Sequence, residues 1–558
     1  MQKLFINGYM NWIRRIICCL ICVLLSVSGC AQEQEAVDIF QETSQIPSAE
    51  QMPLPQGSGT GSKTVLHMNL PEISSLHPLA QVSEEVSNLF SLLYDPAIKV
   101  NEDGSYSANV IESWEISDDE TEYIFHIRKN VAFHEQALGY VDADDILYCL
   151  DFIINQENAA LHQYAEGIES YEKIDELTIR VRTTTKKRNL LFLFSFYVAP
   201  EEYYISKNSR TMAAPVGTGA YSLQDYTENE RMVLICNENW WKTKPIYRTI
   251  ELTPIAQEEL TLGSDVFGAY EMLFTDSMTA GNLGITGKTN INQIRTPYLS
   301  CLVPNVYNNV MSDANLRKAI AYGINRTEMI SAALMGLGEA TLTPLNDNFW
   351  AVAKMAHETS AHDQKLALQY LQQAGYERAE DGRHYKINSD GTRGYLNIRL
   401  LYTPSSGGYD LNRAVAQSIQ KSLEEIGIGV TLVKQAAENY LKTLEEGSFQ
   451  IALCQFYTRQ DQDLSFLFDE SYNYGNFYDS ALRQALNACK EAVSSENILQ
   501  AYTQLQTELQ EKMPVIGLYY KEHCLITVDS VSVPSKLSFA KIFQNINEWQ
   551  EKESSQSK

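Results

Sequence analysis

Residues 112–155 predict a strand, a loop and a capped helix in close succession. In the run YIFHIRKNVAF apolar residues alternate, so every second side chain from Tyr123 to Ile127 falls on one face of a half-buried strand. Asp142 precedes a helix expected over Asp144–Asn155, and its carboxylate is suited to cap that helix. Taken alone, the stretch indicates these elements and nothing about function.

The N-terminus has the pattern of an export signal. An Arg-Arg pair precedes the apolar run Ile16–Val27, which is too short to span a bilayer but suits a signal-peptide core. The run ends in Val27-Ser28-Gly29 before Cys30, which resembles a lipobox. We therefore expect residues 1–29 to be a lipoprotein signal peptide and Cys30 to be lipidated; an uncleaved membrane anchor is the alternative. Either way, the chain would be tethered to the cell membrane on its extracytoplasmic face.

Residues 30–63 are rich in Gln, Glu, Ser, Pro and Gly, a composition that cannot bury enough apolar surface to fold. We expect them to form a flexible acidic tether. The roughly 500 residues that follow are enough for two or three lobes with their own cores. No second apolar run in the sequence is long enough to cross a bilayer.

The chain is strongly acidic, with a formal net charge of −26. Without the three cations that precede Cys30 the charge becomes three units more negative, near −29. Such a charge argues against nucleic acid and anionic lipid surfaces as partners. It is compatible with a cationic or amine-bearing ligand, although solvated acidic surface explains most of it.

Cysteines and histidines give no sign of a metal or catalytic site. Six cysteines follow Cys30 without a C-x-x-C pair, which excludes a zinc ribbon and a dense disulfide framework. Cys301 and Cys454 are a candidate pair, but buried free thiols are favoured. The nine histidines lack paired ligand spacing, and no G-x-S-x-G motif occurs. We predict no metal, no cofactor and no enzymatic activity.

Further local patterns follow along the chain. The glycines of Pro215–Tyr221 are expected to form a tight turn into a strand, because the Lys and Ser/Thr of a phosphate-binding loop are missing. The other expected elements are strands at Thr64–Leu70, Tyr221–Tyr226 and Gly429–Val433, a turn and strand at Tyr171–Arg182, and helices at Glu84–Tyr94, Asp313–Ile330, Asp363–Gly375 and Leu411–Ile428.

About nine blocks resemble, in order, the motifs of the bacterial extracellular solute-binding proteins of family five. Each block is a weak match, but their shared order between about residues 65 and 530 is specific. The blocks that carry the resemblance include Glu112-Ser113-Trp114, Phe125–Lys129, Asp142–Asp145, Tyr171–Arg182, Pro215–Tyr221, Asn237–Trp241, Asp313–Ile330, Asp363–Gly375 and Asn476–Leu482.

The resemblance implies an α/β fold of the two-lobed, type II periplasmic-binding-protein kind, a flytrap with an extra domain on its first lobe. Lobe I would comprise residues 64–93, 201–303 and 514–550, and the extra domain residues 94–200. Lobe II would comprise residues 304–513. Two strand crossings near these boundaries would form the hinge, and the ligand would be caught between the lobes.

The resemblance also implies a function: the substrate-binding component of an ABC importer for oligopeptides. A monomer would capture a peptide in the cleft and deliver it to a permease driven by ATPase subunits. One alternative is a surface peptide-signal receptor or interaction lipoprotein with the same fold. Another is a binder of a nickel chelate or other non-peptide solute.

The loop that holds a peptide's amino terminus in this family falls on residues 455–467. Alignment on Phe466-Leu467 places Arg459 where the family has its amine-binding aspartate. Asp461 or Asp463 replaces that aspartate if the loop is reshaped; otherwise Arg459 favours an acidic or N-blocked ligand. The alternative is that all three are solvated loop charges.

The remaining candidate ligand residues come from the same resemblance. Phe456 and Tyr457 belong to the loop just described. Thr403 stands where small-peptide members have a carboxylate-binding arginine, so a dipeptide clamp is not expected. The last three, on the first lobe where relatives line the cleft, are Glu84, Glu85 and Asn88.

Overall fold

The structure is a computed structural model that describes residues 65–207, 213–255, 269–275, 289–353, 362–406, 409–469, 471–534, 537 and 541–551. The expected signal peptide, the lipidation site at Cys30 and the tether lie outside the described residues, so these remain predictions. The chain from Ser62 onward forms one compact unit. Within the described ranges, no helix has both the length and the apolar character that a membrane span requires.

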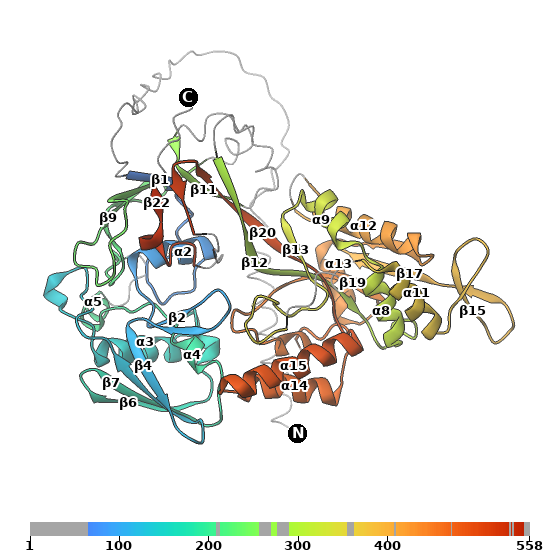
Figure 1. The fold of residues 1–558 in the computed structure, drawn as a ribbon, viewed down its shortest axis with the longest axis horizontal. Helices are drawn as coiled ribbons and strands as arrows, with labels where there is room; N and C mark the ends of the chain where they lie inside the picture. Colours follow the sequence, from blue (N-terminus) through green and yellow to red (C-terminus); the bar gives the residue numbers. More distant parts are fainter. Residues whose placement is uncertain are drawn as a thin grey trace, which may run out of the picture. The chain divides into compact units, whose positions relative to one another are not determined.

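A mixed sheet of eleven strands runs through this unit (Figure 1). In spatial order its strands are β18 (Gly429–Lys434), β17 (Asn397–Tyr402), β19 (Ile451–Tyr457), β12 (Thr289–Pro304), β20 (Ile516–Val528), β11 (Met272–Thr275), β1 (Val65–Asn69), β10 (Thr249–Thr253), β9 (Arg231–Cys236) and β8 (Tyr221–Thr227), with β13 (Gly338–Ala340) paired to β20.

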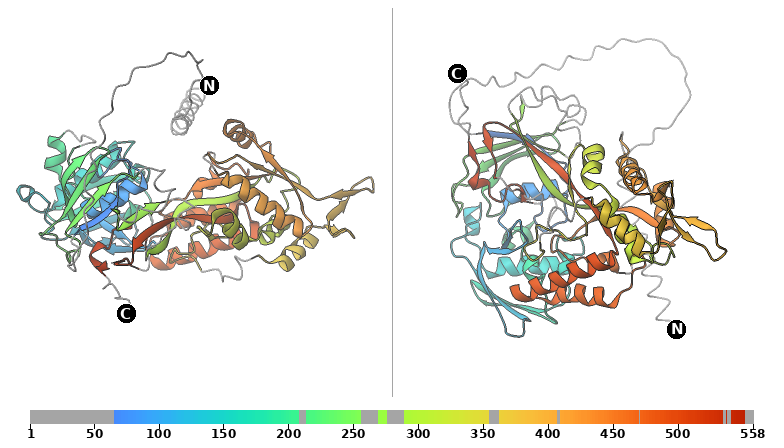
Figure 2. Two further views of the ribbon diagram at one scale, coloured as in Figure 1. Left: turned by 90° about the horizontal axis from the view of Figure 1, so that it is seen from above. Right: turned by 45° about the vertical axis from the view of Figure 1, so that its right-hand side comes forward.

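The two longest strands, β12 and β20, lie side by side in the middle of this sheet (Figure 2). On one side of the pair are β11, β1, β10, β9 and β8, and on the other are β19, β17 and β18. The register of β12 against β20 shifts between Arg295 and Leu299 and again between Ser300 and Cys301. Such irregularities bend a strand, so the pair joins the two halves of the sheet through a kinked crossing.

A second sheet of four antiparallel strands lies in the segment expected to form the extra domain. Along its central strand β5, Tyr123, Phe125 and Ile127 are buried and their neighbours are half-exposed, which confirms the predicted alternation. The strands, in spatial order, are β4 (Ile111–Ile116), β5 (Glu122–Ile127), β7 (Thr178–Thr183) and β6 (Ile168–Asp175).

Helix α3 (Ala143–Asn155) confirms the predicted capped helix. The Asp142 carboxylate accepts hydrogen bonds from the backbone N–H groups of Asp144 and Asp145, at 2.9 and 3.3 Å. The Asp145 side chain in turn accepts from the Asp142 N–H at 3.1 Å, which completes a capping box. Three backbone N–H groups at the start of the helix, which the helix itself cannot pair, are thus satisfied.

Helices cover the sheets, and several of them match the predicted ranges to within a few residues. The helices not yet given are α2 (Glu84–Leu93), α4 (Leu190–Leu193), α5 (Glu201–Ser206), α8 (Ala314–Gly323), α9 (Arg326–Leu334), α11 (Gln364–Gln373), α12 (Leu411–Glu425), α13 (Ala437–Glu445), α14 (Ser480–Glu491) and α15 (Ser495–Lys512). The smaller strands are β2 (Ile98–Val100), β3 (Tyr106–Ala108), β14 (Glu377–Arg378), β15 (His384–Ile387), β16 (Arg393–Tyr395), β21 (Val531–Ser532) and β22 (Gln550–Glu551).

The single helix expected over Asp313–Ile330 is wrong, because the chain forms two helices there, α8 and α9. The first ends at Ile324, whose ψ of 121° is extended, and Asn325 caps the second by accepting from the Glu328 N–H at 3.1 Å. The Arg326 guanidinium donates to the Ala321 and Ile324 carbonyls, which stabilises the break. Apolar spacing continues across the break, so periodicity alone does not reveal it.

The turn and strand expected over Tyr171–Arg182 is also incomplete. Tyr171 lies on β6, so this segment is a hairpin of two strands, β6 and β7, rather than one strand after a turn. Asp175 makes the turn, because its carboxylate accepts from the Leu177 N–H at 2.9 Å.

Four buried clusters form the core of the unit. One draws its members from Leu79 to Tyr204, and another combines residues near the two ends of the described chain, from Leu66 to Trp549. The other two lie on the β12–β19 side of the sheet. All six cysteines after Cys30 are buried and unpaired, which confirms the predicted free thiols; Cys301 and Cys454 are neighbours across β12 and β19 without a bond.

Candidate functional site

The described residues enclose two adjoining cavities beside the β12–β20 crossing. The first has a volume of about 710 Å³ and is lined by the start of α2, the end of β19, the extra-domain segment and residues 541–546. The second, of about 970 Å³, lies between the β2–β3 hairpin, the middle of β12 and the loop after β19. Four residues line both cavities: Lys99, Gln460, Lys541 and Gln544. Cavities of this size accommodate an organic ligand well beyond a single ion.

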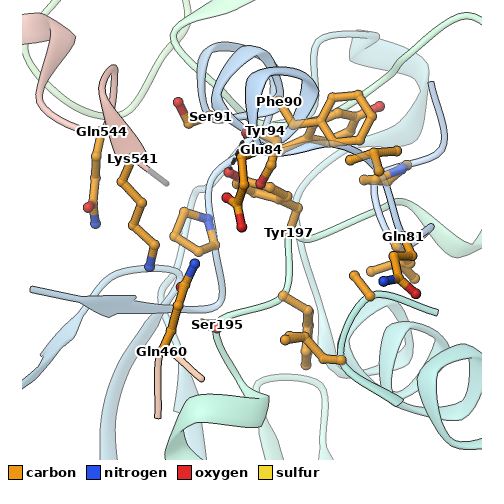
Figure 3. Close-up of a pocket in the computed structure, with 18 of the residues that line it drawn as sticks. Gln81, Glu84, Phe90, Ser91, Tyr94, Ser195, Tyr197, Gln460, Lys541 and Gln544 are labelled. Carbon is orange, nitrogen blue, oxygen red and sulfur yellow. Dashed lines mark hydrogen bonds between the residues drawn. The ribbon is translucent and has the colours of Figure 1, made fainter. Parts of the chain in front are cut away.

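Two carboxylates stand at the wall formed by α2. Ser83 caps this helix by accepting from the Val86 N–H at 3.4 Å, which places Glu84 and Glu85 in its first turn. Carboxylates are stabilised there by the helix dipole. The Glu84 carboxylate accepts a hydrogen bond from the Tyr457 hydroxyl, and its burial raises the pKa of Glu84. Figure 3 shows the Glu84 side chain pointing into the cavity.

Four lysines line the same cavity: Lys99, Lys242, Lys521 and Lys541. Lys99 Nζ donates to Asn545 Oδ1 at 2.8 Å, whereas Lys541 Nζ is buried without a hydrogen-bond partner in the described chain. Burial, and secondarily the charge of Lys99, lowers the pKa of Lys541 to about 8. No ion pair within the described residues joins either lysine to Glu84 or Glu85. The cavity therefore presents both signs of charge to a ligand.

The Asp95 carboxylate also lies at the cavity wall, but hydrogen bonds and an ion pair within the protein already occupy it. The Asp95 carboxylate pairs with Lys242 Nζ at 2.8 Å and accepts from the indole N–H groups of Trp240 and Trp241 at 3.1 and 2.9 Å. Thr218 adds a hydroxyl at 3.2 Å. These bonds occupy the Asp95 carboxylate, so it is a structural group of the wall.

The loop after β19 holds the three charges expected to contact the ligand's amino terminus. The Arg459 guanidinium lies 3.4 Å from Asp461 Oδ1 and 3.8 Å from Asp463 Oδ2, and it stacks over the Tyr164 ring at 4.7 Å. Lys490 adds a cation 3.7 Å from Asp463. Asp461 and Asp463 are buried, so the interpretation as solvated loop charges is wrong. Arg459 and Lys490 together balance the charges of the two aspartates, and Arg459 reaches only the second cavity.

The other predicted site residues separate into those at the cavity and those away from it. Tyr457 lines the first cavity beside Glu84, whereas Phe456 points to the other side of β19 and packs against Phe466 and Tyr472. Asn88 and Thr403 line neither cavity.

Asn88 and Thr403 instead make hydrogen bonds within the fold. Asn88 Oδ1 accepts from the backbone N–H of Ile542 at 2.8 Å, which ties the segment that carries Lys541 to α2. The Thr403 carbonyl follows β17 and accepts from the Asn412 side chain at 3.0 Å.

Lys99, Lys541 and Gln544 were not predicted from the sequence. Lys541 and Gln544 lie near the end of the chain without a motif around them, and Lys99 lies at the centre of a three-residue strand. Only the pairing of β12 with β20 and the return of the C-terminal segment to α2 bring them together. No local pattern in the sequence carries that information.

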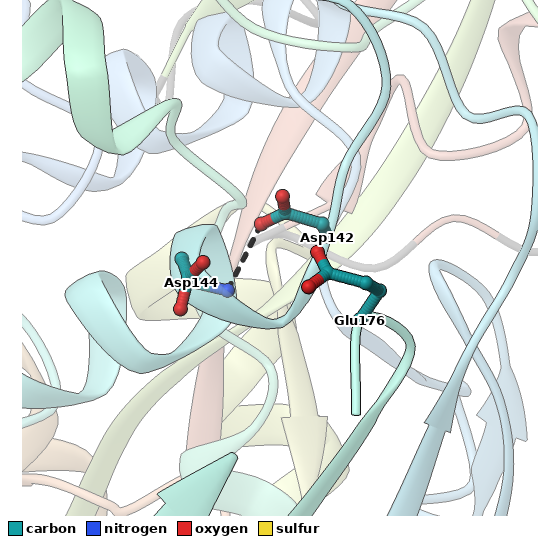
Figure 4. Close-up of side chains that lie close together, drawn as sticks. All are labelled: Asp142, Asp144 and Glu176. Atoms are coloured by element: carbon teal, nitrogen blue, oxygen red, sulfur yellow. Dashed lines mark hydrogen bonds between the residues drawn. The ribbon is translucent and has the colours of Figure 1, made fainter. Parts of the chain in front are cut away.

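One acidic group elsewhere has the spacing of a metal site (Figure 4). Oxygen atoms of Asp142, Asp144 and Glu176 lie within 4.8 Å of one another. Lys173 Nζ already lies 2.8 Å from Asp144 and 3.0 Å from Glu176, and Asp142 caps α3. Two of the three carboxylates are thus paired with Lys173 and the third caps a helix, and none of the three residues lines either cavity.

Comparisons with known proteins show which family and fold the chain resembles. The model of the middle region of the bacterial extracellular solute-binding proteins, family 5, matches residues 105–479. The periplasmic oligopeptide-binding protein OppA of Escherichia coli K12 is 23% identical over 82% of this chain and 87% of its own length. The nickel-binding periplasmic protein of the same organism is 23% identical over 64% of this chain and 69% of its own length.

Solved structures share the fold. HbpA2 from Haemophilus parasuis superimposes with a TM-score of 0.72 at 16% identity, covering 88% of this chain and all of that one. The fold is accordingly the expected α/β architecture of two lobes. With the family model matching about two thirds of the residues, the chain belongs to the bacterial extracellular solute-binding proteins of family 5.

Proposed function

We propose that this protein captures oligopeptides between its lobes and delivers them to the permease of an ABC importer. Members of the family are extracytoplasmic solute-binding proteins of such importers and not enzymes. The observation that carries the peptide assignment is the pair of opposite charges at one cavity: Glu84 and Glu85 on α2, and Lys99 and Lys541 on the facing segments. They do not pair with one another, so both signs remain for an amphoteric ligand.

A peptide suits this cleft in other respects. It carries an amino group, a carboxylate and unpaired backbone donors and acceptors. The first cavity offers Gln455, Gln460 and Gln544 to such groups, and Tyr197, Tyr298 and Tyr457 offer aromatic faces with a polar end. Space beyond these groups accommodates side chains and bridging water, which permits low sequence specificity.

The alternative of a nickel chelate receives less support. Similar proteins include a nickel-binding periplasmic protein and NikZ in complex with Ni(L-His). Imidazole is a preferred ligand of that metal, however, and His523 is the single described histidine that lines the first cavity. None lines the second. The loop around Arg459 departs from the family's pattern, but Arg459 pairs with Asp461 and Asp463, so the loop gives the receptor alternative no specific support.

The proposal includes the parts of the chain that position this cleft. We propose a lipidated Cys30 and a tether over residues 30–63, with the division into lobe I, extra domain and lobe II at the boundaries given above. Within lobe I, we propose that Glu84 and Glu85 receive the amino group of the ligand, since Asp461 and Asp463 are already paired with Arg459 and Lys490.

Isothermal titration of the purified full chain tests the assignment. An equimolar pool of random tetra- to hexapeptides is titrated in parallel with nickel–histidine and with single amino acids. Saturable heat from the peptide pool, with none from the other two, supports the proposal. Binding of nickel–histidine alone, or of no ligand, contradicts it.

A further inference from the structure

Two hydrogen-bond donors at the junction of the cavities are buried and unpaired. They are Lys541 Nζ and Gln544 Nε2, three residues apart on one segment, and in the described chain nothing accepts a hydrogen bond from either. Figure 3 shows both side chains at the cavity, with Gln460 approaching from the loop after β19. An unpaired buried donor is costly, and an unpaired buried ammonium is more costly still. Such groups persist where a ligand supplies the missing acceptor.

The segment that carries these donors is fixed by contacts with buried residues. Asn88 Oδ1 accepts from the Ile542 N–H at 2.8 Å, and Phe543 packs against Trp549. Lys99, whose Nζ is bound to Asn545, lines the same junction and adds a second positive charge. The donors are therefore anchored on buried residues rather than on exposed side chains.

We propose that Lys541 and Gln544 bind the terminal carboxylate of the ligand, with Lys541 determining the preference for a free acid. This inference rests on the peptide assignment above and names the group that this part of the cleft recognises. A carboxylate oxygen accepts hydrogen bonds from several donors at once. The positive charge of Lys541 strengthens the hydrogen bond that this lysine donates.

The charges around the pair favour an anion at this junction. Lys99 and Lys541 both contribute positive charge. After burial, the charge of Lys99 is the second cause that lowers the pKa of Lys541, and an arriving anion opposes it. One oxygen of the nearby Glu84 carboxylate accepts from the Tyr457 hydroxyl, and Lys541 Nζ has no hydrogen-bond partner in the described chain. A positively charged amine of the ligand is disfavoured at this junction, because Lys99 and Lys541 would repel it. Thr403, which stands in the family's carboxylate position, lies away from both cavities.

The test compares ligands that differ only in their carboxyl groups. A peptide selected from the pool is titrated into the full chain as the free acid, as the C-terminal amide, and as the amide with an added internal glutamate. Wild type is expected to bind the free acid about tenfold to hundredfold more tightly than the amide. In Lys541→Met the difference disappears while the affinity for the amide is retained. Lys442→Met, at a lysine whose side chain is 72% exposed, is the matched control and keeps the difference.

Each other outcome is decisive. Equal affinity of wild type for the acid and the amide overturns the inference and leaves the peptide assignment standing. The same holds if Lys541→Met weakens acid and amide equally, because the lysine is then structural. If the glutamate-bearing amide binds as tightly as the free acid, the site recognises any carboxylate and the terminal assignment is wrong. If no peptide binds wild type, the proposed function fails and this inference fails with it.

Discussion

Buried charged side chains in this protein fall into two kinds, those satisfied by their own chain and those that are not. Arg317, Arg326 and Asp95 each have a full set of internal partners. Glu84 and Lys541 share a cavity without pairing with each other. The first kind maintains the fold, and the second kind is where a ligand gains interaction energy.

Glu84→Gln separates the charge of this residue from its hydrogen bond, because the amide oxygen still accepts from Tyr457. We expect affinity for peptides with a free amino terminus to fall about tenfold, and affinity for N-acetylated peptides to stay unchanged. Titration calorimetry with matched peptide pairs measures both. Glu446→Gln, at an exposed carboxylate, is the control. An equal loss for both peptides would mean that Glu84 only supports the wall.

Arg326→Met is expected to lower the free energy of unfolding by at least about 3 kcal/mol. The guanidinium donates to the carbonyls of Thr341 and Gly517 at 3.0 and 2.9 Å and to that of Ala321 at 2.7 Å, and the methionine leaves them buried and unpaired. Chemical denaturation followed by circular dichroism measures the change. Arg413→Met, at an exposed arginine of α12, should stay within about 0.5 kcal/mol. Equal stability of the Arg326 variant would show that water replaces these bonds.

Close contacts between elements depend on small residues and on protonation. The loop that contains Gly217 and Gly219 packs onto the end of α2, and a Cβ at Gly219 would lie 2.4 Å from the Leu93 carbonyl carbon and 2.6 Å from Tyr94 N. Neither glycine has a positive φ, so the predicted tight turn is not the reason for them. Close approach of two backbones is the reason, and a sequence motif does not distinguish these causes.

Gly219→Ala should therefore destabilise the protein by about 3 kcal/mol, because backbone atoms of α2 must shift. Gly338→Ala is the matched control: the nearest atoms to its Cβ are side-chain carbons at 3.4 Å or more, so we expect less than about 1 kcal/mol. Thermal unfolding of both variants gives the comparison. Equal melting temperatures would contradict the close packing of this loop.

His134 ties the same loop to the extra-domain segment and makes the contact sensitive to acid. Its Nδ1 accepts from the Gly217 N–H at 3.2 Å, and its Nε2 lies 3.2 Å from the Gly219 carbonyl, which requires the neutral ring. Burial lowers the pKa of His134 from 6.5 to about 4. The folded state thus binds this proton less readily than the unfolded state, so stability is present above about pH 6.5 and is lost as the pH falls towards 4.

His134→Gln should flatten the pH dependence of stability between pH 6.5 and 4, because the glutamine amide accepts and donates in the same places without titrating. Denaturant titrations at a series of pH values measure the slope. His126→Gln, on a half-exposed histidine of β5, should leave the slope as in wild type. An unchanged slope in His134→Gln would assign the acid sensitivity to other groups.

For the whole molecule, short-range patterns predicted much of the architecture but little of the cleft. The strand around Phe125 and the cap at Asp142 are set by residues within a few positions, and both are confirmed. At the break between α8 and α9, Arg326 donates both to the nearby Ala321 carbonyl and to the distant Gly517 carbonyl on β20, and no local pattern shows the second contact. The cavity unites residues as distant as Glu84, Tyr457 and Lys541, so its charges follow from topology and not from motifs.

The most direct test of this account is native mass spectrometry of the full chain, purified without added ligand and then denatured to release what it carries. We predict peptides of mixed sequence with free termini, one for each protein molecule, and re-binding of such peptides after their removal. Recovery of a metal chelate or another non-peptide solute, or a protein that is empty and ignores a random peptide pool, would contradict the account.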